Sequence, residues 1–299
     1  MKLGIIGAGK WGSALHFALS KKNDVYITSR HHHNLKNFVS LEEILNLEYL
    51  ILVLPAQVIG PWLEKHPLKK DHKVLLASKG IDIRQKKFLN EILQQFLPQE
   101  HIAVLSGPSF AAEVQKGLPT AVVVSSCNEA LAKTYAQTFP DFMKAYVDDD
   151  VIGAEIAGAY KNVIAIASGI CDGLQLGNNA RAALLARGLV EMERFASRFG
   201  AKMRTFLGLS GAGDLFLTAS STLSRNYRVG LGLASRKDLD MILHDLGEVA
   251  EGVYTVEAII EIAKEHSIYV PIAHEVYEIL HGKDPKLSII HLLERNSDD

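Results

Sequence analysis

The sequence has little of several features that mark whole classes of protein. Its 299 residues include two cysteines, Cys127 and Cys171, which are too few for a disulfide framework and are typical of a reducing compartment. The net charge is −2, so no positive field attracts nucleic acid or an anionic membrane surface. We find no solenoid repeat, no low-complexity tract and no signal-peptide pattern at the N-terminus. These absences favour a cytoplasmic enzyme over a secreted scaffold, a repeat protein or a nucleic-acid-binding protein.

The composition is that of a globular protein with a large core. Hydrophobic residues make up 48% of the chain and charged residues 22%, and the length suits two domains. Strand signals become rare after the acidic run 148–150. We therefore predict an α/β fold, with a Rossmann-type, mostly parallel sheet in a dinucleotide-binding domain (1–150), followed by an all-helical substrate domain (151–299).

The hydrophobic pattern gives the expected segments of both domains. Short apolar runs predict strands at 2–6, 24–28, 49–54, 73–77, 102–105, 120–125 and 144–147. Helices are predicted at about 10–22, 41–46 and 129–138 in the first domain. In the second domain, helical patterns cover 151–171, 178–199, 225–235, 238–246, 255–266, 272–280 and 286–294.

The longest apolar segment, VIGAEIAGAYKNVIAIASGIC at 151–171, contains Glu155, Lys161 and Asn162. A membrane span would place all three in hydrocarbon at a cost of several kcal/mol, so we expect no stable membrane insertion and a buried helix instead. A buried lysine needs an anionic partner or a shifted pKa, and both occur in catalysis. The alternative is a lysine that extends to solvent along its own stem.

A glycine-rich turn follows the first predicted strand. Gly7, Gly9 and Gly12 form G-x-G-x-x-G between a strand and a helix, which is the arrangement of dinucleotide-binding folds. Gly7 allows the tight turn, Gly9 lets a pyrophosphate approach, and Gly12 lets the helix and strand pack closely. The alternative is a glycine turn that binds nothing.

The second predicted strand ends in Ser29, Arg30 and His31 rather than in a carboxylate. A guanidinium at this position, with His31, suits the 2′-phosphate of NADP(H), so NADP(H) is favoured and NAD(H) is possible. We interpret His32 and His33 as a solvated loop rather than a metal-binding tract, and we predict no metal site.

Other polar groups stand where a ligand could bind. Lys79, Gly107 and Ser109 follow predicted strands, at the edge where open α/β sheets bind ligands, although all three suit ordinary turns. Asp214 lies in a glycine-rich apolar stretch. The run 220–228 gathers hydroxyls, an amide and two arginines before a helix, which suits either a phosphate or a plain N-cap by Ser224. The stretch 247–252 suits either a turn or a ribose contact, and the sequence by itself favours the turn.

Together, these motifs resemble the bacterial NAD(P)-dependent glycerol-3-phosphate dehydrogenases over nearly the whole chain. The matching motifs are GAGKWG at 7–12, SKG at 78–80, SGPSFAAE at 106–113, GLPTA at 117–121, AYKNVIAIASGICDG at 159–173, ARAALLARGLVEM at 180–192, GLSGAGDLFLT at 208–218, SRN at 224–226 and EVAEG at 248–252.

The resemblance implies interconversion of dihydroxyacetone phosphate and sn-glycerol 3-phosphate with NAD(P)H, which supplies phospholipid synthesis. It implies that Lys161 is the catalytic proton donor and acceptor, held by Asp214, with Asn162 and Thr218 completing the hydrogen bonds. The other implied substrate contacts are Lys79, Gly107, Ser109, Ser224, Arg225 and Asn226. Besides the three glycines, the implied cofactor contacts are Lys10, Trp11, Arg30, His31, Lys79, Ala111, Arg225, Val249 and Glu251. The implied partner is a small phosphorylated triose, and a homodimer is expected.

The sequence departs from the family pattern at two places. Lys10 stands where a serine is common, and the segment 31–41 is shorter than in many relatives. Both departures fall on implied cofactor contacts.

Other functions fit part of the pattern. They are a β-hydroxyacid dehydrogenase acting on a carboxylate and a dinucleotide sensor without turnover. The arginine cluster near Ser224 favours a phosphate over a carboxylate, and a sensor needs no buried lysine–aspartate pair. A sugar-nucleotide dehydrogenase needs a cysteine nucleophile, and Cys171 lies in an apolar run.

Overall fold

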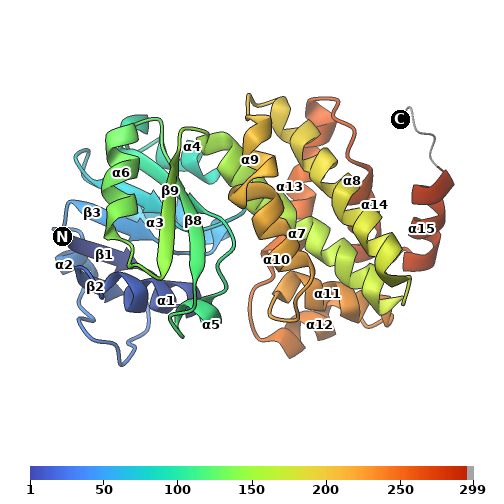
Figure 1. The fold of residues 1–299 in the computed structure, drawn as a ribbon, viewed down its shortest axis with the longest axis horizontal. Coiled ribbons are helices and arrows are strands. Elements are labelled where there is room, and N and C mark those ends of the chain that lie inside the picture. The colour runs from blue at the N-terminus through green and yellow to red at the C-terminus, as the bar shows by residue number, and fades with distance from the viewer. Residues whose placement is uncertain (295–299) are drawn as a thin grey trace. The chain divides into compact units, whose positions relative to one another are not determined.

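A computed structural model describes residues 1–294, with the side chains of residues 289, 290, 293 and 294 excepted (Figure 1). The chain forms two compact units. The first consists of Met1–Lys79 and Lys87–Glu155, and the second of Gly80–Lys86 and the chain from Ile156 onward. The division falls inside one helix, α7 (Val151–Gly173).

A seven-stranded sheet forms the middle of the first unit, with the order β2-β1-β3-β4-β7-β8-β9. All neighbouring strands are parallel except β7 and β8, so the predicted mostly parallel sheet is confirmed. The strands are β1 (Lys2–Ile6), β2 (Asp24–Thr28), β3 (Tyr49–Leu52), β4 (Lys73–Leu76), β7 (Ile102–Ser106), β8 (Thr120–Ser125) and β9 (Met143–Asp148).

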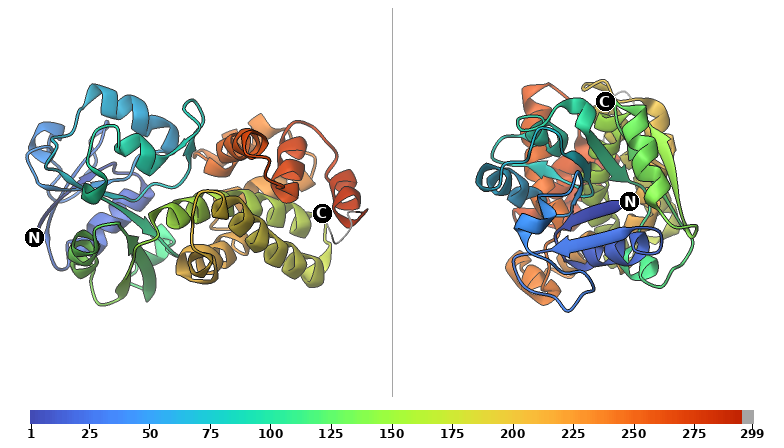
Figure 2. Two further views of the ribbon diagram at one scale, coloured as in Figure 1. Left: turned by 90° about the horizontal axis from the view of Figure 1, so that it is seen from above. Right: turned by 90° about the vertical axis from the view of Figure 1, so that its left-hand side faces the viewer.

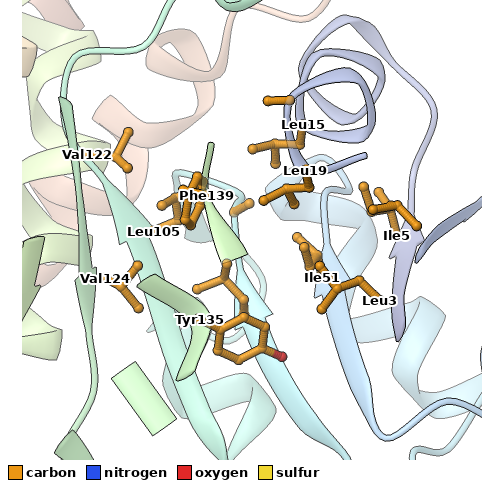
Figure 3. Packing of buried hydrophobic residues seen from close by; sticks show 14 of the residues in the cluster. Leu3, Ile5, Leu15, Leu19, Ile51, Leu105, Val122, Val124, Tyr135 and Phe139 are labelled. Carbon is orange, nitrogen blue, oxygen red and sulfur yellow. The ribbon is translucent and has the colours of Figure 1, made fainter. Parts of the chain in front are cut away.

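Helices cover both faces of this sheet, which explains its almost continuous apolar strands (Figure 2). One face packs against α1 (Lys10–Leu19), α5 (Ala111–Val114) and α6 (Glu129–Thr138), with Leu15, Leu19 and Tyr135 in the core (Figure 3). The other face packs against α2 (Leu41–Ile44), α3 (Ala56–Lys65) and α4 (Leu89–Leu93). Helices α3, α4 and α5 were not predicted from the sequence.

The described part of the second unit is helical apart from β5. After α7 come α8 (Gly177–Ser197), α9 (Met203–Leu207), α10 (Asp214–Ala219), α11 (Arg225–Ala234), α12 (Leu239–Leu246), α13 (Glu251–Glu265), α14 (Pro271–Leu280) and α15 (Pro285–Glu294). Two short helices, α9 and α10, were not predicted. In addition, α13 starts at Glu251, so the stretch interpreted as a turn supplies the first residues of a helix.

Helix α7 is the core helix of the second unit. It is the one described helix long and apolar enough to cross a membrane, but 89% of that apolar window is buried inside the protein. Its small residues Ala157 and Ala159 are fully buried. The predicted buried helix is thus confirmed.

A short piece of the chain between β4 and α4 belongs to the second unit. It contains β5 (Ile81–Asp82), which packs against α13, and it precedes β6 (Lys87–Phe88). The Lys86 ammonium lies 2.8 Å from Glu265 Oε1 and 3.3 Å from Glu261 Oε2, both on α13. These contacts join residues far apart in the sequence.

Candidate active site

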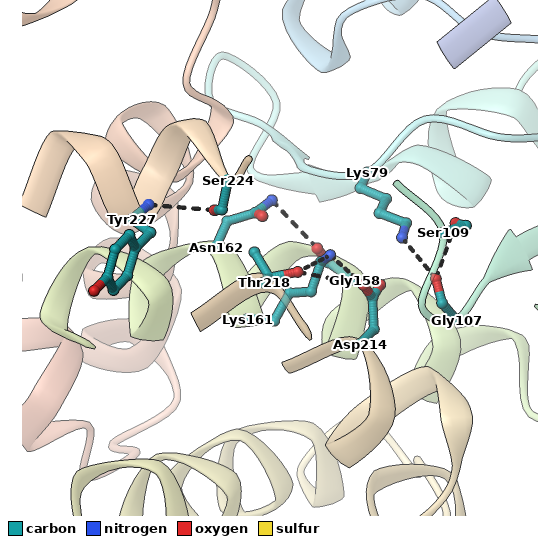
Figure 4. Close-up of polar contacts among 10 residues, drawn as sticks. All are labelled: Lys79, Gly107, Ser109, Gly158, Lys161, Asn162, Asp214, Thr218, Ser224 and Tyr227. Carbon is teal, nitrogen blue, oxygen red and sulfur yellow. Dashed lines mark hydrogen bonds and ion pairs between the residues drawn. The ribbon is translucent and has the colours of Figure 1, made fainter. Parts of the chain in front are cut away.

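Lys161 is buried, and its ammonium lies between two side chains of α10 (Figure 4). Lys161 Nζ donates to Asp214 Oδ1 at 2.5 Å and to Thr218 Oγ1 at 2.7 Å. Asp214 and Thr218 are four residues apart, so one face of the helix presents both. Lys161 is 6% exposed and Asp214 1% exposed, so the alternative of a lysine reaching into solvent is wrong.

The Asp214 carboxylate compensates the buried positive charge, as the low polarity of the interior requires. Ser168 Oγ of α7 donates to Ala219 O at 2.7 Å, which holds the far end of α10 against α7. The Asn162 side chain bonds within its own helix, because its Nδ2 donates to Gly158 O at 3.3 Å in the previous turn of α7. The ammonium is therefore held by Asp214 and Thr218.

The glycine-rich stretch before Asp214 forms a π-helical turn, Leu209–Gly213. A side chain at Gly211 would collide with the backbone of Phe206, so the turn can fold back on α9 only with glycine there. Glycine spacing alone does not distinguish such a turn from a loop, which is why α10 was missed. The turn sets the start of α10 and thus the position of Asp214.

The first turn of α11 carries the residues that are predicted to bind a phosphate, Ser224, Arg225 and Asn226. Ser224 caps the helix, because its Oγ accepts a hydrogen bond from Tyr227 N at 3.2 Å. Asn226 Oδ1 accepts a hydrogen bond from Gly252 N at 3.0 Å, at the start of α13. A side chain at Gly252 would approach Asn162 O to 2.8 Å. The starts of α11 and α13 therefore meet α7 one residue beyond Lys161.

Arg225 is the accessible member of this group. Its side chain is 42% exposed, and Nη1 lies 3.4 Å from Glu248 Oε2. Val249 is also 42% exposed, and Glu251 is the first residue of α13. An exposed guanidinium beside a capped helix N-terminus suits an anionic ligand.

The glycine turn of the first unit has the geometry that the motif predicts. Gly7 has φ +116°, and a side chain there would collide with Val53 O. A side chain at Gly12 would collide with Gly7 O, whereas one at Gly9 would meet no atom within 4 Å. Helix α1 begins at Lys10, followed by Trp11, and its first amide groups follow the open Gly9. These features fit the pyrophosphate of a dinucleotide.

The end of β2 lies beside this turn, because Gly7 N donates to Thr28 O at 2.9 Å. Arg30 and His31 follow β2 and are exposed, and Arg30 Nε donates to His31 Nε2 at 3.1 Å. Ala111 begins α5, which packs against α1. The structure thus brings the glycine turn and the end of β2 together within the first unit.

Lys79 and Gly107 follow the neighbouring strands β4 and β7. Lys79 Nζ donates to Gly107 O at 3.4 Å, and Ser109 Oγ donates to the same oxygen at 3.1 Å (Figure 4). Gly107 has φ +101°, which favours glycine. These three predicted residues form one cluster at the carboxyl ends of the two strands.

Two other findings bear on the chemistry. Within residues 1–294, no group of three or more His, Cys, Asp or Glu side chains could hold a metal ion. Cys171 is buried, and burial, with a smaller effect of Asp172, raises the pKa of its thiol, which does not suit a nucleophile.

Two buried polar groups were not predicted from the sequence. Tyr160 Oη donates to Glu191 Oε1 at 2.8 Å, and Glu191 accepts hydrogen bonds from Ile272 N and Ala273 N at the start of α14. In the second group, Asp172 binds Tyr227 and Arg181. Hydrophobic periodicity carries no signal for such pairs.

A dinucleotide-type turn in an α/β unit and a buried, carboxylate-paired lysine in a helical unit define a class, the two-domain nicotinamide-dependent dehydrogenases. The family models narrow this class. Residues 21–132 match the N-terminal model of NAD-dependent glycerol-3-phosphate dehydrogenase, and residues 150–291 match the C-terminal model. The chain belongs to the NAD-dependent glycerol-3-phosphate dehydrogenase family.

Similar proteins support this assignment. The chain is 92% identical over 299 residues to the NAD(P)+-dependent glycerol-3-phosphate dehydrogenase of a Nitratiruptor species, covering 100% of both chains. It is 60% identical to the protein of that name from Sulfurimonas denitrificans, covering 98% of this chain and 99% of the relative. The solved glycerol-3-phosphate dehydrogenase of Coxiella burnetii is 34% identical and superposes with a TM-score of 0.92, covering 98% of this chain and 99% of that chain.

Proposed function

We propose that Lys161 is the proton donor and acceptor in the interconversion of dihydroxyacetone phosphate and sn-glycerol 3-phosphate by this NAD(P)-dependent oxidoreductase. The observation that carries the proposal is the buried ammonium held by Asp214 and Thr218. When bound, the nicotinamide supplies the hydride that reduces the ketone carbon. Negative charge then develops on the ketone oxygen. Lys161 stabilises that charge and gives up a proton to form the alcohol.

Asp214 and Thr218 hold the Lys161 ammonium in one place, so it needs no reorganisation when charge develops. In the reverse direction the neutral amine accepts the alcohol proton. The carboxylate of Asp214 stabilises the resulting ammonium. Asp214 is also a proposed substrate contact.

The phosphate of the substrate is proposed to bind at the first turn of α11. Arg225 supplies an exposed guanidinium, the Asn226 amide supplies a further donor, and Ser224 shapes the turn as its cap. Lys79, Gly107 and Ser109 are proposed as further substrate contacts. Arg225 and Lys79 are also proposed to contact the cofactor.

The proposed cofactor is NADP(H) in preference to NAD(H). The pyrophosphate is proposed to lie against Gly7, Gly9 and Gly12 at the start of α1, and the 2′-phosphate against Arg30 and His31. The remaining proposed contacts are Lys10, Trp11, Ala111, Val249 and Glu251. We further propose a cytoplasmic homodimer.

Replacing Lys161 tests the proposed chemistry. We expect Lys161→Ala to lower kcat by at least about a thousandfold, because the developing charge loses its stabilising ammonium, and to change the Kd for NADPH less than about twofold. NADPH oxidation with dihydroxyacetone phosphate and fluorescence titration of NADPH measure the two quantities. Lys86→Ala, which removes an exposed lysine with two carboxylate partners, is the matched control. Turnover retained in Lys161→Ala would contradict the proposal.

A further inference from the structure

Helices α7 and α11 of the second unit touch through their backbones. A side chain at Gly169 of α7 would collide with Tyr227 O, and one at Gly230 of α11 would collide with Ile166 O. Such close contact fixes how far apart the two helices lie. Other groups must limit how far α7 and α11 can slide along one another.

A polar group supplies that limit at the end of α7. Asp172 Oδ2 accepts a hydrogen bond from Tyr227 Oη of α11 at 2.6 Å and one from Arg181 Nη1 of α8 at 2.9 Å. Arg181 Nη2 also donates to Asn178 Oδ1 at 3.0 Å, which fixes the guanidinium on α8. The Asp172 side chain is 18% exposed, so solvent screens these bonds only in part.

Burial, together with the hydrogen bond to Asp172 and its charge, raises the pKa of Tyr227 to about 12. The hydroxyl therefore stays protonated and can donate to Asp172 throughout the neutral pH range.

The same tyrosine belongs to the first turn of α11. Its amide donates to Ser224 Oγ, and its two preceding neighbours are Arg225 and Asn226. Asp172 lies eleven residues after Lys161 on the continuous helix α7, about 16 Å along its axis. One rigid helix thus carries Lys161 at one point and the anchor of the α11 turn at another.

We propose that Asp172, acting through Tyr227 and Arg181, is a positioning residue that fixes the first turn of α11 at the distance from Lys161 that a triose phosphate requires. The inference rests on the proposed function of Ser224, Arg225 and Asn226 as the residues that bind the substrate phosphate. Asp172 itself touches neither substrate nor cofactor in this proposal. Its predicted effect on the substrate is on binding of the substrate phosphate.

Comparing two substrates separates positioning from simple stability. Dihydroxyacetone has the same ketone as dihydroxyacetone phosphate and no phosphate, so at saturating NADPH its turnover does not depend on the phosphate contacts of the α11 turn. With saturating NADPH, we expect Tyr227→Phe to lower kcat/KM for dihydroxyacetone phosphate about tenfold, mainly through KM. We expect kcat/KM for dihydroxyacetone to change less than about twofold.

Two further variants keep the test independent of folding losses. Tyr135→Phe removes a buried hydroxyl that donates to Leu50 O and Lys73 O in the first unit, and we expect it to leave the ratio of the two substrates unchanged. Asp172→Ala should lower the ratio as Tyr227→Phe does, and the double variant should lower it no further than Asp172→Ala alone.

Arg225→Ala, measured alongside, separates the positioning role of Asp172 from the phosphate-binding role of Ser224, Arg225 and Asn226. If Arg225→Ala lowers the ratio and Tyr227→Phe does not, the positioning role is wrong and the phosphate-binding role of the α11 turn is retained. The same holds if Tyr227→Phe lowers kcat/KM equally for both substrates. If Arg225→Ala leaves the ratio unchanged, the assignment of Ser224, Arg225 and Asn226 as phosphate-binding residues is wrong, and the inference about Asp172 fails with it.

Discussion

The charges of Lys161 and Asp214 are stabilised by direct contact with each other rather than by water. A charge with 6% exposure has lost nearly all of its water, and its partner at 2.5 Å compensates that loss. Removing Asp214 would leave the ammonium buried without its compensating carboxylate, which costs about 3–5 kcal/mol. The same enclosure makes the ammonium an effective partner for charge that develops on a bound ketone.

Arg30 is the side chain on which the proposed cofactor preference depends. We expect Arg30→Ala to raise the KM for NADPH about tenfold and the KM for NADH less than about twofold, because the 2′-phosphate occurs only in NADPH. Steady-state kinetics with dihydroxyacetone phosphate measure both constants.

His33→Ala is the matched control for Arg30→Ala, since His33 is exposed in the same loop. Equal effects of Arg30→Ala on the two cofactors would show that Arg30 does not contact a 2′-phosphate.

Single side chains were predictable from the sequence only in part. A lysine within an apolar helix is rare enough to single out Lys161 by itself. Asp214 could be singled out as a carboxylate in an apolar stretch. It lies 53 residues from Lys161, and no local pattern joins the two, so the resemblance alone paired them. The Tyr160–Glu191 pair and the Asp172 group were missed for the same physical reason, since buried polar contacts leave no period in the sequence.

Strands and long helices were more predictable than their connections. The apolar runs located all seven strands of the main sheet to within two residues at each end. They could not show that β8 is antiparallel to β7, because both directions give a buried apolar strand. The π turn and α10 were missed, since glycine predicts an irregular backbone without specifying its form.

The contact between α7 and α11 predicts a difference between two glycines of α11. We expect Gly230→Ala to lower the free energy of unfolding by about 2–3 kcal/mol, because the added methyl group meets the backbone of α7. Gly232→Ala should lower it less, because its methyl group meets the Ile242 side chain rather than the backbone of another helix. Urea denaturation followed by circular dichroism measures both; equal losses would mean that the helices separate easily.

Over the full chain, Glu155 gives stability an unusual pH dependence. Burial, with a smaller contribution from the charge of Glu91, raises the pKa of this carboxyl to about 8, although Asn90 N donates to it at 2.9 Å. The folded protein therefore holds the proton more tightly than the unfolded chain. Stability from this group is present below pH 4.5 and is lost as the pH rises towards 8.

Glu155→Gln, which resembles the protonated carboxyl, tests this dependence. We expect the variant to match the wild type near pH 5 and to exceed its free energy of unfolding by up to about 5 kcal/mol above pH 8. Urea titrations at several pH values measure the difference. A difference between Glu155→Gln and the wild type that does not change with pH would show that the buried carboxyl is not protonated.

The segment Gly80–Lys86 has a consequence for synthesis on the ribosome. Lys86 and its partner Glu265 are 179 residues apart. At typical elongation rates, Lys86 leaves the ribosome roughly 10–35 s before the carboxylates of α13 emerge. Nearby Ile81, only 1% exposed in the finished fold, must wait for the same helix to cover it. The nascent protein therefore carries this apolar side chain uncovered until α13 has been synthesised, and uncovered apolar surface favours aggregation during folding.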